Sequence, residues 1–358
     1  MPCPRCQILP LSSERRGTLL LTAAVRELIA VMGEFLRAHG LAFEDAGLEL
    51  RLADANLVEF IERVRDSGSF NTLELQAIWA LLLEAGESLS FQSLTRARTL
   101  EQWLKLLDAC ALIEILEAQR FVSWFQPILA ARDGGLVGYE SLLRGIRPDG
   151  GLMFPGEIFT LALANDLLFQ VDRQARETAL RCAAEQGLEG QLFVNFVPTA
   201  IYDPRHCLQS TVGWARRLGF DPGRLVFEVV ETERVADFDH LKHILDFYRD
   251  AGYRVALDDV GSGYASLNLL ATLKPDIIKI DMEIVRGVDR DPQRQSVLRA
   301  LIGIARDLGI QTLAEGIETA TELAYVLAQG VDLVQGYLFA RPAQHPQAPY
   351  RPDPWPQP

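Results

Sequence analysis

The chain has 358 residues, 49% of them hydrophobic, which is enough for two folded domains and lies outside the range of disordered proteins. Its formal net charge of -13 argues against a protein that binds polymeric nucleic acid through a basic face. The charge does not exclude a small anionic ligand, because bound metal ions can locally reverse the field. No long uninterrupted apolar run is present, so the sequence predicts no membrane span, and we expect a cytoplasmic protein.

The N-terminus carries two closely spaced cysteines, Cys3 and Cys6, which have the spacing of half a zinc site. No second pair follows at the spacing of a zinc finger. We therefore interpret them as an incidental feature of the terminus. A metal or redox role, such as pairing two chains, is the alternative.

Residues 1–120 are predicted to form an all-helical region. The spacings of Asn71 with Glu74 and of Thr99 with Gln102 are typical of capping boxes at helix starts. Nothing here has catalytic spacing, so we expect a regulatory or dimerisation region. The predicted helices are Thr18–His39, Ala53–Arg65, Asn71–Glu84 and Thr95–Ala118.

Residues 121–343 alternate between apolar segments with strand patterns and amphipathic helical stretches, among them Phe238–Ala251, Arg294–Leu308 and Thr319–Ala328. Alternating strands and helices predict a parallel sheet, and eight repeats predict a closed, TIM-like (β/α)8 barrel of the α/β class. The strand candidates are Phe121–Leu129, Leu136–Glu140, Leu192–Asn195, Leu225–Glu228, Val255–Asp259, Ile277–Asp281, Gln311–Glu315 and Leu333–Gln335.

One connection in this pattern is too short for a parallel barrel. Only the polar turn Ala130–Gly134 separates the first strand from the second, whereas a parallel crossover needs about a dozen residues. We therefore expect the first two strands to form a hairpin, with one strand antiparallel to the rest. Residues 344–358 are proline-rich and are expected to form an extended or disordered tail.

Polar residues stand at the ends of seven of these strands. Asp258 and Asp259 follow an apolar strand directly, and two adjacent carboxylates are costly to bury unless a cation compensates their charge. Asp before a glycine turn is also ordinary turn chemistry. Because barrel enzymes carry their chemistry at the carboxyl ends of the strands, seven polar ends in register indicate a site rather than isolated caps.

The strand-end motifs resemble those of the EAL-domain phosphodiesterases, which hydrolyse cyclic di-GMP in bacterial signalling. The resemblance covers about residues 123–342 and does not extend to the N-terminal region. The motifs are Glu140-Ser141-Leu142-Leu143-Arg144, Asn195, Glu228-Val229-Val230-Glu231, Asp258-Asp259, Lys279-Ile280-Asp281, Glu315-Gly316-Ile317-Glu318 and Gln335-Gly336-Tyr337.

This resemblance implies a set of metal ligands: Glu140, Asn195, Glu228, Asp258 and Asp259, with Glu315 beside them. Carboxylate and amide oxygens suit Mg²⁺ or Mn²⁺, and no cluster of Cys or His is present to prefer zinc. Asp258 would bridge two ions. Two ions about 3.5–4 Å apart can activate a water molecule and stabilise both oxygens of an in-line phosphoryl displacement.

The resemblance also implies catalytic roles for Lys279 and Glu315, with Lys279 orienting the water or offsetting developing charge. Glu231 would hold the loop Gly261–Ser266 in place. The alternative interpretation is that Glu231 is an ordinary cap of its strand. Residues that contact the dinucleotide are implied as well, although the first of them could equally be a satisfied strand amide: Gln126, Arg144, Asp281, Glu318 and Gln335.

The function implied by the resemblance is metal-dependent hydrolysis of cyclic di-GMP to the linear dinucleotide pGpG by a homodimer. Ser141 and Val260 depart from the family pattern, which has Ala and Phe there, but neither change alters a ligand type. Two alternatives are a catalytically silent cyclic di-GMP receptor, which signals through its N-terminal helices or a partner, and a barrel enzyme of unrelated chemistry. The intact ligand set favours the enzyme over the receptor.

Overall fold

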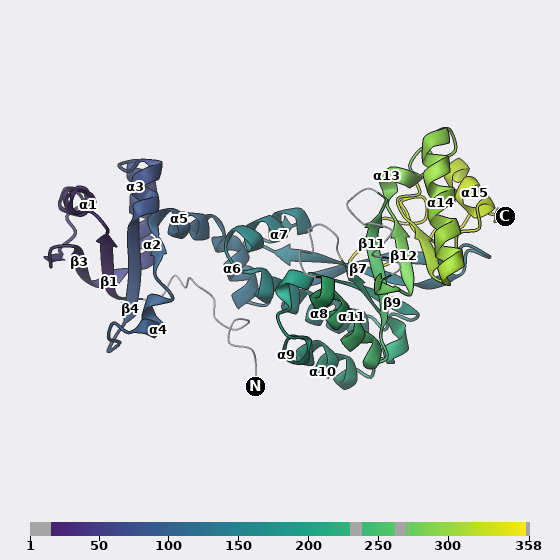
Figure 1. Cartoon of the computed structure of the whole chain (residues 1–358), viewed down its shortest axis with the longest axis horizontal. Helices are drawn as coiled ribbons and strands as arrows, with labels where there is room; N and C mark the ends of the chain where they lie inside the picture. The colour runs from purple at the N-terminus through teal and green to yellow at the C-terminus, as the bar shows by residue number, and fades with distance from the viewer. Residues whose placement is uncertain (1–15, 230–237, 262–269, 271, 356–358) are drawn as a thin grey trace.

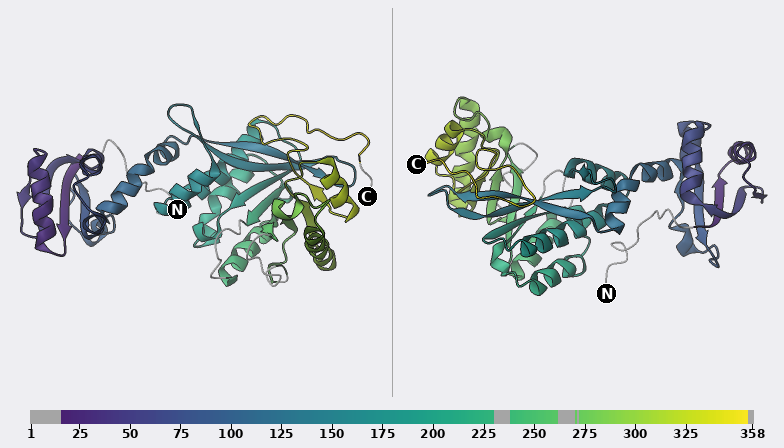
Figure 2. Two further views of the ribbon diagram at one scale, coloured as in Figure 1. Left: turned by 90° about the horizontal axis from the view of Figure 1, so that it is seen from above. Right: turned by 180° about the vertical axis from the view of Figure 1, so that it is seen from behind.

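The structure is a computed structural model that describes residues 16–229, 238–261, 270 and 272–355. Cys3, Cys6, Glu231 and most of the Gly261–Ser266 loop lie outside these residues. The molecule is elongated, with an N-terminal sheet at one end and a barrel at the other, as Figures 1 and 2 show. Helices α5 (Leu100–Asp108) and α6 (Cys110–Glu117) lie between them.

The N-terminal region is not all-helical, and the prediction for it was wrong. It contains a five-stranded antiparallel sheet in the order β2-β3-β1-β4-β5, with helices beside it. The elements are β1 (Arg16–Ala23), α1 (Arg26–Ala38), β2 (Glu44–Asp45), β3 (Glu49–Asn56), α2 (Leu57–Ser67), α3 (Thr72–Ala77), β4 (Ile78–Glu84), α4 (Phe91–Leu94) and β5 (Arg98–Thr99). Each segment that was predicted to be a single helix therefore contains a strand and at least one helix.

The cause lies in the central strands. In β1, Leu19, Leu20 and Leu21 are all buried, because helices cover one face of the sheet and, on the other face, Leu20 packs with Leu81 and Leu83 of the neighbouring strand β4 in a smaller apolar cluster. A strand buried on both faces loses its alternation of apolar and polar residues, so periodicity cannot distinguish it from a helix. The two capping boxes, at the starts of α3 and α5, were predicted correctly.

The predicted barrel is confirmed, and all eight strand candidates form it. The ring runs β6-β14-β13-β12-β11-β10-β9-β7 and closes through the pairing of β6 with β7, while β8 extends β7 at its edge. The strands are β6 (Phe121–Ala130), β7 (Leu136–Ile146), β8 (Leu152–Met153), β9 (Gln191–Phe196), β10 (Leu225–Val229), β11 (Arg254–Val260), β12 (Ile277–Ile280), β13 (Gln311–Ala314) and β14 (Leu333–Val334).

Strand β6 is antiparallel to both of its neighbours, as the short turn predicted, and the remaining pairs around the ring are parallel. Helices connect and surround the strands: α7 (Pro155–Ala164), α8 (Leu168–Glu185), α9 (Pro204–Cys207), α10 (Gln209–Arg217), α11 (Phe238–Asp250), α13 (Met282–Val285), α14 (Pro292–Leu308) and α15 (Ala320–Ala328), with short 3₁₀ turns at Pro198–Ala200 and Pro222–Arg224. Within the described residues, no helix has both the length and the apolar character that a membrane crossing requires.

One hydrophobic cluster joins the N-terminal sheet to one side of the barrel, which also has a core of its own. A continuous cluster of buried side chains runs from Leu21 of β1 through Trp103 of α5 and Ile115 of α6 to Leu143 of β7 and Ile158 of α7. The two parts are therefore packed together by apolar contacts and are not merely connected by the chain.

The proline-rich tail is docked on the barrel through Trp355. Its indole Nε1 donates a hydrogen bond of 2.8 Å to the carbonyl of Ala131, and its ring stacks on Phe339 with 6.1 Å between centroids. Gly134 makes room for it, because a Cβ at that glycine would lie 2.6 Å from the indole ring. The proline content of the tail predicted an extended or disordered segment, and it did not indicate that Trp355 would dock on the barrel.

The first prediction concerns this anchor. Trp355→Ala should lower the free energy of unfolding by about 3 kcal/mol, the cost of truncating a buried aromatic side chain. Tyr350→Ala is the control, because Tyr350 belongs to the same tail and its side chain is exposed. Urea unfolding followed by circular dichroism measures both. Equal unfolding midpoints for the two variants would show that the tail is not docked in solution.

Candidate active site at the carboxyl ends of the barrel strands

The site is built directly above an apolar floor inside the barrel. The floor contains Ile128, Phe193, Val226, Ala256, Ile277, Leu313 and Leu333, which form one buried cluster. Successive side chains of a strand point to opposite faces, so the residue two positions further on points inward again. For strands β9 to β14 that position holds Asn195, Glu228, Asp258, Lys279, Glu315 and Gln335.

The remaining two strands, β6 and β7, reach the same level with the same spacing of two residues. Because β6 runs in the opposite direction, Gln126 lies two positions before its floor residue, Ile128. On β7, Glu140 lies two positions after Gly138, where a Cβ would meet the backbone of Gln191 at 2.0 Å. Strand period and barrel closure together thus bring the predicted residues into one layer.

Lys279 is the centre of this layer. Its Nζ lies 3.2 Å from Glu140 Oε1, 3.0 Å from Glu228 Oε1, 3.0 Å from Asp258 Oδ1 and 2.8 Å from Glu315 Oε1. The lysine is 1% exposed. An ammonium group in a site with little water interacts strongly with such neighbours, so the four acids and the lysine form one electrostatic unit.

A β-bulge aims both adjacent aspartates at the site. The pairing of β11 with β12 shifts register between Leu257 and Val260, so Asp258 and Asp259 together face the single residue Lys279. Asp259 has a positive φ of 53°, a conformation that an L residue other than glycine adopts at a cost. The sequence showed the pair of acids but gave no indication of the bulge.

The carboxylates outnumber the cation that they surround, and their pKa values reflect this. Burial and the neighbouring acids raise the pKa of Glu228 and of Glu315 well above the ordinary value, even though Lys279 opposes the shift. Burial tends to raise the pKa of Glu140 as well, but Lys279 and the hydrogen bonds from Gln335 and Asn195 leave it lowered. Lys279 alone therefore does not balance the charge that these carboxylates would carry if all of them were ionised.

The residues fit divalent metal ions. Carboxylate oxygens of Asp258, Asp259 and Glu315 lie within 4.8 Å of one another, the spacing of a shared cation site. Both oxygens of Glu228 are buried: Oε1 has Lys279 Nζ at 3.0 Å, and Oε2 has no hydrogen bond from the described residues. Buried anionic oxygens without donors are expensive unless a cation supplies the missing interaction, and oxygen ligands suit Mg²⁺ and Mn²⁺.

Two of the residues predicted to contact the substrate, Gln335 and Gln126, lie at or beside the acid cluster. The Gln335 amide donates a hydrogen bond of 2.8 Å from Nε2 to Glu140 Oε2, while its buried Oε1 has no hydrogen bond from the described residues. Gln126 donates to the carbonyl of Ala340 at 3.2 Å and lines the same cavity as Gln335. Both alternatives for Gln126 therefore remain, because its amide is satisfied and also faces the cavity.

Arg144 and Asp281 have other surroundings. The guanidinium carbon of Arg144 lies 5.1 Å from the ring centre of Trp124 and 5.2 Å from that of Phe154, and its buried Nε has no hydrogen bond from the described residues. Burial lowers the pKa of Arg144. Asp281 accepts a hydrogen bond from the amide of Glu283 at the start of α13, so it caps that short helix.

Two cavities flank Glu140. The larger, of about 540 Å³, lies between β7, β9 and helices α7 and α8, and most of its wall is apolar, with Phe159, Leu163 and Leu168 among the lining residues. The smaller, of about 150 Å³, is polar and lies on the side of Glu315 and Gln335. Sequence analysis missed Arg286, which lines the smaller cavity from the end of α13, because no strand-end pattern marks it.

Comparisons with known proteins agree with this geometry. The family model described as EAL domain matches residues 106–342, well over half of the chain. A probable cyclic di-GMP phosphodiesterase of Escherichia coli, PdeG, is 33% identical over 235 residues, which are 63% of this chain and 45% of that protein. The signaling protein YkoW of Bacillus subtilis is 26% identical over 68% of this chain and 30% of its own length. The chain thus spans less than half the length of these curated relatives.

Solved structures are similar as well. A standalone EAL protein from Vibrio cholerae O395, bound to cyclic di-GMP, has a TM-score of 0.59 and 37% identity, covering 64% of this chain and 95% of that one. BlrP1 of Klebsiella pneumoniae, in a manganese and cyclic di-GMP complex, has a TM-score of 0.57 and 22% identity but covers 92% of this chain and 96% of that one. The second likeness shows the fold alone.

The second prediction concerns pH. Burial and the charge of Asp258 raise the pKa of Asp259 to about 7 in the folded protein, against about 3.9 when unfolded. Between these values the folded state holds a proton that the unfolded chain has released, so stability falls as pH rises from about 4 to 7. In EDTA, Asp259→Asn should raise the melting temperature near pH 8 and change it little near pH 4. A difference in melting temperature between variant and wild type that is the same at every pH would contradict this prediction.

Proposed function

The chain belongs to the EAL domain family, and we propose that it is a metal-dependent phosphodiesterase that hydrolyses cyclic di-GMP to linear pGpG. The observation that supports the proposal is the buried acid cluster around Lys279, whose ammonium contacts Glu140, Glu228, Asp258 and Glu315. A receptor that only binds the dinucleotide has no need of so many buried acids, which are costly to keep together.

The chain's own residues suit the binding of two divalent ions. Asp258, Asp259 and Glu315 would hold one side of the pair, and Glu140, Asn195 and Glu228 would hold the other, with Asp258 between them. When bound, Mg²⁺ or Mn²⁺ would supply an activated water molecule and would stabilise charge on the phosphate oxygens.

Lys279 would act on the reacting phosphate group. Its ammonium is fixed by Glu140, Glu228, Asp258 and Glu315, and the surrounding carboxylates raise its pKa well above the ordinary value although burial lowers it. It therefore stays protonated at neutral pH and acts as a donor, not as a base. A donor placed where charge develops lowers the barrier without reorganising during the reaction.

The two cavities suggest how a dinucleotide would lie. Glu140 belongs to the walls of both, so a phosphate placed at the acid cluster would leave its two nucleosides on opposite sides. The larger, apolar cavity accepts one base by burying its faces, and the smaller, polar cavity offers hydrogen-bonding groups to the other. The similar Vibrio cholerae protein is bound to cyclic di-GMP, and we carry this ligand over to the present chain as part of the proposal.

Assembly and regulation complete the proposal. We expect a cytoplasmic homodimer whose residues 1–120 regulate the barrel or contribute to the dimer, and sedimentation velocity of the full chain tests the dimer. The decisive assay incubates the purified chain with cyclic di-GMP and Mn²⁺ and resolves the product by chromatography. pGpG supports the enzyme, whereas ligand retained without product supports the silent receptor.

The third prediction tests the bridging carboxylate. Asp258→Asn should abolish turnover and weaken Mn²⁺ binding in calorimetry, because the change removes charge from both ion positions. Asp246→Asn on α11 is the control, since this exposed carboxylate pairs only with surface cations of its own helix in the described contacts. Near-normal activity of Asp258→Asn at saturating Mn²⁺ would show that the site is misplaced.

The fourth prediction separates catalysis from binding. Lys279→Met should lower kcat by roughly 10²-fold while KM changes little, because the lysine acts on charge that develops during the reaction. The variant should also melt at a lower temperature than wild type in EDTA, since its buried acids lose their counter-charge, and Mn²⁺ should reduce that difference. A large rise in KM with kcat preserved would make Lys279 a binding residue.

A further inference from the structure

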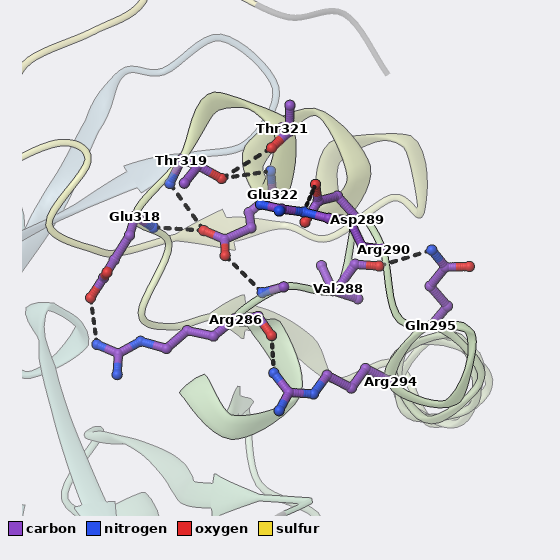
Figure 3. Close-up of polar contacts among 11 residues, drawn as sticks. Arg286, Val288, Asp289, Arg290, Arg294, Gln295, Glu318, Thr319, Thr321 and Glu322 are labelled. Atoms are coloured by element: carbon purple, nitrogen blue, oxygen red, sulfur yellow. Dashed lines mark hydrogen bonds and ion pairs between the residues drawn. The ribbon is translucent and has the colours of Figure 1, made fainter.

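The smaller cavity has a rim of opposite charges that the reaction chemistry does not use. Arg286, at the end of α13, and Glu318, after β13, both line it, and Arg286 Nη2 lies 2.5 Å from Glu318 Oε1. Tyr337 lines the same cavity and has an exposed ring. Figure 3 shows the side chains of Arg286 and Glu318 extended toward each other from two separate loops.

This ion pair is poorly suited to a stabilising role. The side chains of Arg286 and Glu318 are 45% and 43% exposed, and ion pairs in contact with water contribute little to stability. Both groups therefore keep hydrogen-bonding capacity for a ligand, because a guanidinium has five N–H donors and a carboxylate has several acceptor positions.

The backbone that carries the pair is nevertheless held firmly. The carbonyl of Arg286 accepts a hydrogen bond from the side chain of Arg294, on α14. The next amide, that of Gly287, donates a hydrogen bond of 2.7 Å to Glu322 Oε1, on α15 (Figure 3). Gly287 has a φ of +68°, which favours glycine, so the turn after Arg286 has one defined geometry.

Glu322 fixes both sides of the rim at once. Its second oxygen, Oε2, accepts hydrogen bonds from the amides of Glu318 at 2.9 Å and Thr319 at 3.0 Å. Its side chain is buried, and although burial alone would raise its pKa, the amide donors of Gly287, Glu318 and Thr319 leave the pKa lowered. One ionised carboxylate thus sets the distance between the backbones of Arg286 and Glu318.

We propose that Arg286 is a specificity-determining residue that reads the O6 and N7 edge of one guanine of cyclic di-GMP, and that Glu322 positions it. The inference rests on the proposed function. Guanine presents two acceptors on that edge, which match the parallel donors of a guanidinium, and its N1–H and N2–H donors match the Glu318 carboxylate beside it. Adenine presents the N6 amino group, a hydrogen-bond donor, in place of O6, so a donor would oppose the donors of Arg286. Tyr337 offers a ring face to either base.

The test compares cyclic di-GMP with cyclic di-AMP on the full chain. Preference is the ratio of kcat/KM for the two compounds or, if wild type binds without turnover, the ratio of their dissociation constants. Arg286→Ala should lower the preference for cyclic di-GMP about tenfold or more, through KM rather than kcat. Arg286→Lys should recover affinity without full selectivity, because an ammonium has no planar fork. Glu322→Gln should raise KM for cyclic di-GMP and leave kcat nearly unchanged.

Two controls separate recognition from general damage. Arg290→Ala removes another exposed arginine of the same loop, which pairs with Asp289 and does not line the cavity, and should leave the preference unchanged. Asn71→Ala weakens the cap of α3 in the N-terminal region and should lower the melting temperature without changing the preference. Equal losses for both dinucleotides in Arg286→Ala would assign Arg286 to a phosphate and overturn the inference. Unchanged values for both dinucleotides in Arg286→Ala overturn it as well, with the proposed function intact, and a wild type that neither binds nor hydrolyses cyclic di-GMP overturns both.

Discussion

The concentration of buried carboxylates around Lys279 is the constraint on which the rest of the barrel depends. One ammonium contacts four acids, and a fifth, Asp259, stands beside them in a backbone conformation that costs energy. Such a cluster opposes folding because each acid loses its hydration. The barrel tolerates it because the apolar floor and the helices around the strands contribute burial over many residues, whereas the cluster occupies a single layer.

The same layer explains how distant segments cooperate. Gln335 and Glu140 are 195 positions apart in the sequence, yet they form a hydrogen bond because β14 and β7 both pair with β6. Ring closure is therefore as important to the site as the acids themselves. The docked tail supports this closure, since Trp355 contacts Ala131 after β6 and Phe339 after β14.

Helix α7 connects the N-terminal region to the site. Ile158 and Ala162 belong to the core that continues into the N-terminal sheet, whereas Phe159 and Leu163 of the same helix line the larger cavity. A displacement of the sheet transmitted through α5 and α6 would therefore reach the wall of that cavity by direct packing. This contiguity is the physical basis on which we propose a regulatory role for the N-terminal residues.

The sequence by itself determined the barrel and the end of it at which polar residues gather. Eight apolar segments with polar ends predicted the strands, and the turn Ala130–Gly134 predicted the antiparallel one, whereas the roles of the acids and of Lys279 were implied by the resemblance to the EAL-domain family and stay proposals. The predictions of the fold succeeded because they depend on local features: the period of two in a strand and the minimum length of a crossover.

Only the tertiary structure decided the N-terminal sheet, the bulge at Asp258 and Asp259, and the rim formed by Arg286 and Glu318, which Glu322 holds. In the sheet, burial on both faces removed the alternation that marks a strand. The bulge depends on the register between two strands, and the rim depends on loops that meet only when α13 and α15 are in place. Each of these features is a relation between segments, and a pattern within one segment carries no information about it.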